Sequence, residues 1–138
     1  MKFNPLNPTV QMLGRWQPWH NGHTELFKRC YAMTGQVAIM IRQVPEKREA
    51  NSRVPGQDDN PFDLETVKQN ISAELFMHGF TIDEDYVIMV VPNIVDISYG
   101  RGVGYTFTEH DLGDAVHSIS ATKIREKMRA EGTLADKS

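Results

Sequence analysis

The sequence predicts an α/β protein with a Rossmann-like parallel sheet and helices on both faces, in a single domain. Short apolar runs typical of buried strands alternate along the chain with segments of helical periodicity. The 138 residues suit one compact domain, and 40% of them are hydrophobic, which is enough for a core. We expect the core to span residues 9–132, with tails at 1–8 and 133–138 and a mobile loop at 43–60.

The first third of the chain predicts a strand, a helix and a second strand. Thr9–Leu13 carries the first apolar run. From about Gly22 to Thr34 the apolar residues fall on one broad helical face, and Gly35 stands where a helix-ending glycine belongs. Val37–Ile41 is a continuous apolar run, which is typical of a parallel strand covered on both faces.

The second helix is predicted from its first turn. Asp63 suits the capping position, while Phe62 and Val67 stand in the register of a hydrophobic staple. Gly79 is expected to end this helix. The polar stretch before it, residues 43–60, shows no period and predicts the mobile loop.

The last third predicts strands and one more helix. Tyr86–Val91 is a third apolar run. Asn93–Tyr105 mixes short apolar pieces with three glycines, which predicts a short strand and a glycine-rich loop. Val116–Ile119 is expected to form a last short strand. Ser120 then caps a final helix that ends at Gly132.

Composition narrows the class of protein. The net charge of -3, from 15 basic and 18 acidic residues, argues against a nucleic-acid binder, which needs a basic footprint. The single cysteine, Cys30, fits a reducing compartment. No segment resembles a signal peptide, and no apolar run is long enough to cross a bilayer. We therefore expect a cytoplasmic protein without membrane partners; a homo-oligomer stays open.

The first group of candidate site residues lies between the first strand and the first helix. His20 and His23 stand three positions apart with Gly22 between them, so both imidazoles can face one cavity at a helix start. Free N–H groups at such a turn favour a phosphate. An isolated pair of this kind is also compatible with a surface histidine beside a capping one. A zinc site is a further alternative, but no third ligand stands out.

The second group opens the final helix. Ser120, Thr122, Lys123 and Arg125 crowd its first turn, where the helix dipole already attracts anions. Taken alone, this stretch is also compatible with an ordinary serine cap and a basic solvated face. Two helix N-termini of the phosphate-binding type at one sheet edge favour a shared ligand, because ligands bind beyond the carboxyl ends of parallel strands.

In both groups the chain resembles the HxGH nucleotidylyltransferase superfamily, also called cytidylyltransferase-like. That family carries HxGH after its first strand and an ISxTxIR-type signature at a late helix, here His20–His23 and Ile119–Arg125. The resemblance implies transfer of a nucleotidyl group from a nucleoside triphosphate, with Mg²⁺ carried by the triphosphate and no metal site of the protein's own. It implies His20, His23 and Arg125 as catalytic residues. The implied phosphate- and nucleotide-binding residues are Gly14, Arg15, Trp16, Gln17, Gly22, Ser120, Thr122 and Lys123.

The residues before His20 sharpen the resemblance. Gly14–Pro18 is similar to the opening motif of archaeal-type nicotinamide mononucleotide adenylyltransferases, and Asn60–Phe62 is similar to their NPF segment. These matches favour ATP over CTP. They imply transfer of AMP to the phosphate of a small-molecule acceptor, with release of pyrophosphate. A cytidylyltransferase for a sugar or polyol phosphate is one alternative, and an inactive nucleotide-binding regulatory protein is another.

The resemblance does not identify the acceptor. Those adenylyltransferases follow NPF with an acid–arginine pair, whereas Glu65–Thr66 stands here, and they carry a tryptophan after the third strand that this chain lacks. Tyr99 and Arg101 lie in the glycine-rich stretch and are the expected acceptor residues. A glycine-rich turn with packing tyrosines is the alternative interpretation of that stretch.

Overall fold

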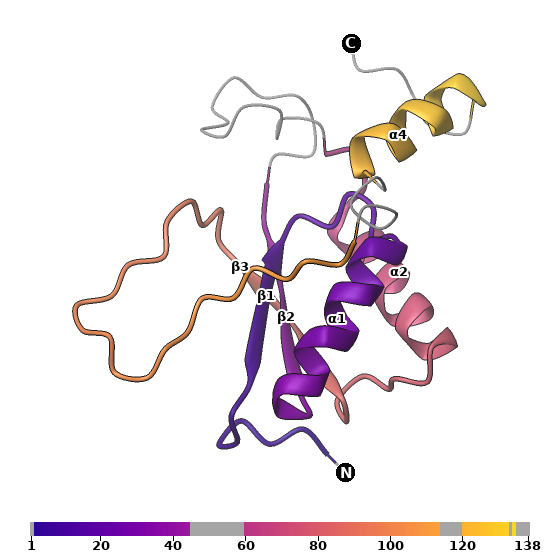
Figure 1. The fold of residues 1–138 in the computed structure, drawn as a ribbon. Coiled ribbons are helices and arrows are strands. Elements are labelled where there is room, and N and C mark those ends of the chain that lie inside the picture. Colours follow the sequence, from indigo (N-terminus) through magenta and orange to yellow (C-terminus); the bar gives the residue numbers. More distant parts are fainter. Residues whose placement is uncertain (1, 45–59, 114–119, 133, 135–138) are drawn as a thin grey trace.

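The computed structural model describes residues 2–44, 60–113, 120–132 and 134. In this part of the chain, parallel strands alternate with helices (Figure 1). The elements are β1 (Val10–Gly14), α1 (Asn21–Thr34), β2 (Val37–Arg42), α2 (Leu64–Met77), β3 (Tyr86–Val91) and α4 (Ala121–Ala130).

The three strands form one parallel sheet in the order β1-β2-β3. Val10 is level with Val37, and Val37 is level with Tyr86, so the strands are in register from their first residues. Their carboxyl ends therefore meet at one edge, the upper end of the sheet in Figure 1. The expected α/β class with a parallel sheet is confirmed.

One face of the sheet carries the core. Met12, Ile39 and Ile88 are paired across neighbouring strands, so their side chains point to the same side of the sheet. That side packs against α1 and α2, whose buried residues belong to the same cluster. The cluster comprises Met12, Trp16, Trp19, Phe27, Cys30, Val37, Ile39, Ile41, Val67, Ile71, Leu75 and Tyr86.

The opposite face of the sheet, which we call the helix-free face, carries neither of these helices. α4 lies beyond the carboxyl edge of the sheet (Figure 1). Helices on both faces, as the sequence predicts, are therefore not confirmed among the residues described. Two parallel β-α-β units that step in the same direction account for this, because right-handed crossovers place both helices on one side.

The helices begin and end where their capping residues predict. Asp63 caps α2 by accepting the Thr66 backbone N–H at 2.8 Å, and Ser120 caps α4 by accepting that of Lys123 at 3.3 Å. Gly35 takes up a left-handed conformation, with φ 76°, directly after α1. Among the described residues, none of the helices has the length and apolar character needed to cross a bilayer.

One expectation for the rest of the chain differs from the structure, and two others fall on residues that the structure does not describe. The predicted short strand within Asn93–Tyr105 is wrong, because this stretch contains no helix or strand. An alternating pattern needs a neighbouring strand to bond with, whereas residues 95–109, which we call the arm, are exposed. The predicted strand at Val116–Ile119, and residues 45–59 of the predicted mobile loop, lie outside the described residues.

Candidate functional site

The turn after β1, residues 14–20, is built around a buried tryptophan. Trp16 adopts a left-handed backbone conformation, with φ 55°, and its indole N–H donates to the Met40 carbonyl at 3.1 Å. The ring lies over Gly14, where a β-carbon would come within 2.9 Å of the ring carbons. Gly14 is therefore needed here because it leaves room for the indole.

Gly14→Ala is expected to destabilise the fold by about 1–3 kcal/mol, because the added methyl group forces the buried indole to move. Urea unfolding would measure the loss. Gly100→Ala is the matched control, since nothing lies within 4 Å of the place that its β-carbon would take, and it should leave the unfolding free energy nearly unchanged. Equal stability of both variants would contradict the packing role of Gly14.

The turn is also bonded to the lead-in of α2. The Gln17 side-chain amide donates to the Phe62 carbonyl and its oxygen accepts the Phe62 N–H, both at 2.9 Å. The Arg15 guanidinium donates to the buried Asn60 side-chain oxygen at 2.8 Å. These contacts join the residues that precede α1 to the residues that precede α2. The side chain of Gln17 thus positions the turn, with both of its polar atoms engaged.

His20 and His23 close the turn as a reciprocal cap on α1. The His20 Nδ1 accepts the Gly22 N–H at 3.0 Å, and the His23 Nδ1 accepts the His20 N–H at 3.2 Å. The rings stack with their centroids 3.7 Å apart. Because each Nδ1 accepts a hydrogen bond, each neutral ring carries its proton on Nε2. Neither Nε2 has a hydrogen-bond partner among the described residues, so two N–H donors remain for a ligand.

Both histidines are held neutral. Burial lowers the pKa of His20, and burial together with the neighbouring His20 lowers the pKa of His23 to about 3. Trp16 and Trp19 supply this apolar environment, with ring centroids 4.8 and 5.4 Å from that of His23. At neutral pH the site therefore offers uncharged donors, because both pKa values lie below the ordinary 6.5 of histidine.

The neutral His23 makes stability depend on pH. Below its ordinary pKa of 6.5 the unfolded chain binds a proton that folded His23 refuses, so acid favours unfolding. The unfolding free energy should fall by about 1.4 kcal/mol per pH unit between 6.5 and 3 from this group alone. Urea unfolding at several pH values measures the slope. His23→Gln should flatten it, and an unchanged slope in this variant would contradict the assignment.

α4 is joined to the turn through Arg125. This arginine is only 1% exposed, and its Nη1 donates to the Gln17 carbonyl at 2.6 Å, while its Nη2 lies 3.4 Å from the Thr122 hydroxyl. Gln17 and Arg125 are 108 positions apart, so this contact brings the two predicted groups together at the carboxyl edge. Lys123 and Thr122 are exposed on the first turn of α4, beside the cap at Ser120.

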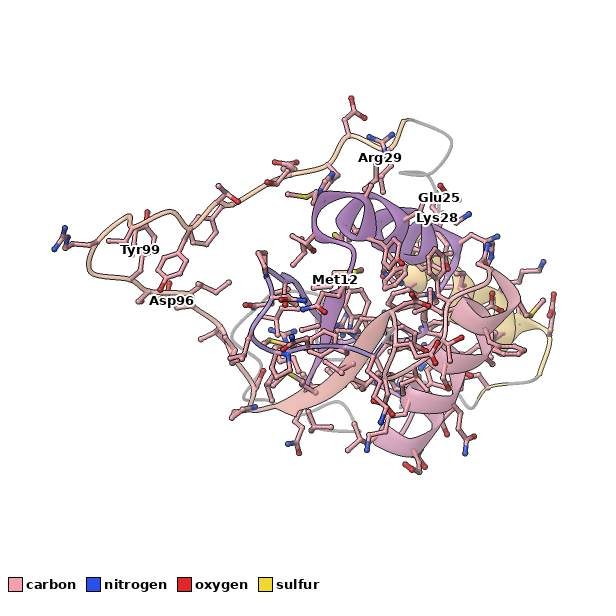
Figure 2. The ribbon with its side chains drawn as sticks, turned by 90° about the horizontal axis from the view of Figure 1, so that it is seen from below. Met12, Glu25, Lys28, Arg29, Asp96 and Tyr99 are labelled. Carbon is pink, nitrogen blue, oxygen red and sulfur yellow. The ribbon has the colours of Figure 1, made fainter. Side chains whose placement is uncertain are left out.

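The expected acceptor residues lie elsewhere. Tyr99 and Arg101 are exposed on the arm that follows β3. Figure 2 shows Tyr99 and Asp96 standing away from the body of the protein, on the side away from α2. The structure thus brings together the two groups of candidate site residues but does not bring Tyr99 or Arg101 to them.

Sequence reasoning missed the positioning role of Asn60 and Phe62. In the sequence Asn60 stands out only by the NPF resemblance and Phe62 also by its staple register, yet the Asn60 side chain and the Phe62 backbone bind the turn directly. A polar residue two positions before an aromatic one, just ahead of a capped helix, is the signal that could have revealed it. Within the described ranges, no group of three or more His, Cys, Asp or Glu side chains is placed to hold a metal ion.

Fold and site together define an α/β protein with a parallel sheet, in which two capped helices begin near a neutral histidine pair at the carboxyl edge. Comparison of the chain with protein-family models, with curated proteins and with solved structures gives no match. A function is therefore inferred from the geometry of the site and from the sequence motifs.

Proposed function

We propose that the protein is a nucleotidyltransferase that transfers AMP from ATP to the phosphate of a small-molecule acceptor and releases pyrophosphate. The observation that carries the proposal is the contact between Arg125 and the Gln17 carbonyl, 2.6 Å long. It joins the turn that holds His20 to the helix that begins after Ser120. The HxGH motif and the ISxTxIR-type motif, far apart in sequence, thereby meet at the edge where parallel sheets bind ligands.

The proposed reaction is a direct displacement at phosphorus. A phosphate oxygen of the acceptor attacks the α-phosphorus of the triphosphate and forms a new P–O bond. The bond between the α-phosphorus and the α–β bridging oxygen breaks, and pyrophosphate leaves with the electron pair. The protein forms no covalent bond to the substrate in this reaction. It catalyses the reaction by aligning the acceptor with the triphosphate and by stabilising charge on the phosphoryl oxygens. Mg²⁺ enters as part of the substrate, bound to the triphosphate.

The histidine pair suits this task because both rings are neutral donors. In the proposed complex the Nε2–H groups of His20 and His23 bind oxygens of the α- and β-phosphates. The first turn of α4 binds the β- and γ-phosphates with its backbone N–H groups, Ser120, Thr122 and the exposed Lys123. Arg125 acts as a positioning residue that holds α4 against the turn, since its guanidinium already bonds to Gln17.

We favour ATP over CTP because Gly14–Pro18 resembles the opening motif of the adenylyltransferases. We assign the sheet as Rossmann-like, with the triphosphate beyond the ends of β1 and β2. Tyr99 and Arg101 would reach an acceptor only after the arm moves, so the acceptor is defined only as a phosphorylated small molecule.

The test is pyrophosphate release from Mg–ATP and from Mg–CTP, measured separately over a panel of phosphorylated acceptors. We expect turnover with ATP and at least one acceptor. Turnover with CTP alone would replace the proposal with a cytidylyltransferase. Tight triphosphate binding without pyrophosphate release from any acceptor would favour the regulatory alternative.

A further inference from the structure

The arm, residues 95–109, is an apolar surface that the described part of the chain leaves uncovered. All fifteen of its residues are exposed. The arm has two legs, residues 95–99 and 103–107. Large apolar side chains occupy every second position of both legs, with exposed fractions from 41% to 68%. These side chains are Val95, Ile97, Tyr99, Val103, Tyr105 and Phe107.

Among the described residues, the hydrogen bonds and the ring contact of the arm join residues within it. The Tyr99 and Phe107 rings stack with centroids 5.5 Å apart and so hold the two legs together. The Ser98 hydroxyl bonds to the Asp96 carboxylate, and the Val103 N–H bonds to the Arg101 carbonyl. None of these bonds reaches the body of the protein. In both views the arm stands out on the side away from α2 (Figures 1 and 2).

Among the described residues no helix covers the helix-free face of the sheet, and its partly exposed apolar side chains stand beside the polar Gln11 and Arg42. Leu13, Met40 and Met89 are level with one another in neighbouring strands and point away from α1 and α2. Met89 is 44% exposed, and Val87 on the same face is partly exposed. Parallel sheets are ordinarily covered on both faces, so this face is expected to have a partner.

We propose that two copies of the chain associate, with the arm of each docked on the helix-free face of the other. One chain carries both surfaces, and a two-fold arrangement buries each of them twice. The large apolar side chains of the arm suit burial against Leu13 and Met40, and the arm has three ionised residues, Asp96, Arg101 and Glu109.

The available area is consistent with a dimer. Tyr99, Tyr105 and Phe107 are each more than half exposed. Since an aromatic side chain buries about 150–250 Å², these three leave on the order of 300 Å² of surface per copy for a partner. Two arms, their aliphatic residues and the two sheet faces that they cover would together exceed the roughly 1,000 Å² of a specific interface.

Analytical ultracentrifugation of the full chain at micromolar concentrations tests the proposal. Wild type should be dimeric. Tyr105→Ser combined with Phe107→Ser on the arm, and Met89→Lys on the sheet face, should each weaken the dimer by at least about tenfold. Phe76→Ser is the matched control, since Phe76 is 71% exposed on α2 outside both surfaces, and it should leave the dimer intact.

Three outcomes would overturn the proposal. A monomeric wild type would mean that the arm docks on its own sheet or on a different protein. A dimer that survives both the arm and the sheet variants would place the interface elsewhere. Loss of the dimer in the Phe76→Ser control as well would mean that the effect is not specific to the arm. Circular dichroism of every variant checks that exposed substitutions leave the fold unchanged.

Discussion

Replacing His20 with asparagine is expected to lower the rate of nucleotidyl transfer by about a hundredfold or more, because one donor to the transferring phosphoryl group is removed. Asparagine is a favoured capping residue, so its side-chain oxygen can still accept the Gly22 N–H that His20 Nδ1 now accepts. The fold should therefore be retained, with a change of less than about 1 kcal/mol in the unfolding free energy. Pyrophosphate release, with the acceptor that serves the wild type, measures the rate.

His78→Asn is the matched control for this experiment. His78 is exposed at the far end of α2 and touches neither motif, so its replacement should leave the rate unchanged. Near-normal turnover in His20→Asn would remove the histidine from the catalytic set. A large loss of stability in His20→Asn would instead assign the histidine a structural role, and the rate of the variant would then have to be compared at equal folded concentration.

Arg125→Ala is expected to give the largest loss of stability. It deletes a buried side chain and leaves the Gln17 carbonyl without its donor at 2.6 Å, which together should cost about 2–4 kcal/mol. The loss should loosen α4 from the turn, so triphosphate affinity should fall further than the unfolding free energy alone explains. Urea unfolding, followed by the fluorescence of Trp16 and Trp19 beside the contact, measures the first effect.

Lys123→Ala separates the loss of positive charge in α4 from the loss of the contact. Lys123 is exposed on the same turn of α4, so its replacement should change the unfolding free energy by less than about 0.5 kcal/mol. It should nevertheless weaken triphosphate binding, because it removes a cation from the proposed phosphate site. If Arg125→Ala were as stable as Lys123→Ala, the contact between α4 and the turn would not hold the site together.

The sequence is sufficient for the regular elements because their signals are local. Asp63 and Ser120 cap the helices that the sequence assigns to them, and β3 spans the predicted Tyr86–Val91. Capping and periodicity depend on neighbouring residues, which a sequence displays directly. The pairing of strands in one direction follows from the same alternation of strands and helices.

The exposure of the arm and the contacts between residues within the site could not be predicted from the sequence. Val95 to Phe107 alternates as a strand does, but the pattern cannot show that this stretch pairs with no strand in the described part of the chain. The motifs predict that Gln17 and Arg125 face a ligand, whereas the structure shows Gln17 bonded to Phe62 and Arg125 bonded to Gln17. Whether a polar side chain meets a ligand or another part of the chain depends on tertiary packing.

The central claim is that the histidine turn and the start of α4 bind one triphosphate. A double-mutant cycle on Mg–ATP affinity, measured by isothermal titration calorimetry, tests it most directly. Wild type should bind, and His20→Asn and Ser120→Ala should each weaken binding. The double variant should lose less than the sum of the two, because both residues contact one ligand. Wild type without affinity for the triphosphate, or a Ser120→Ala variant that binds as tightly as wild type, would contradict the claim.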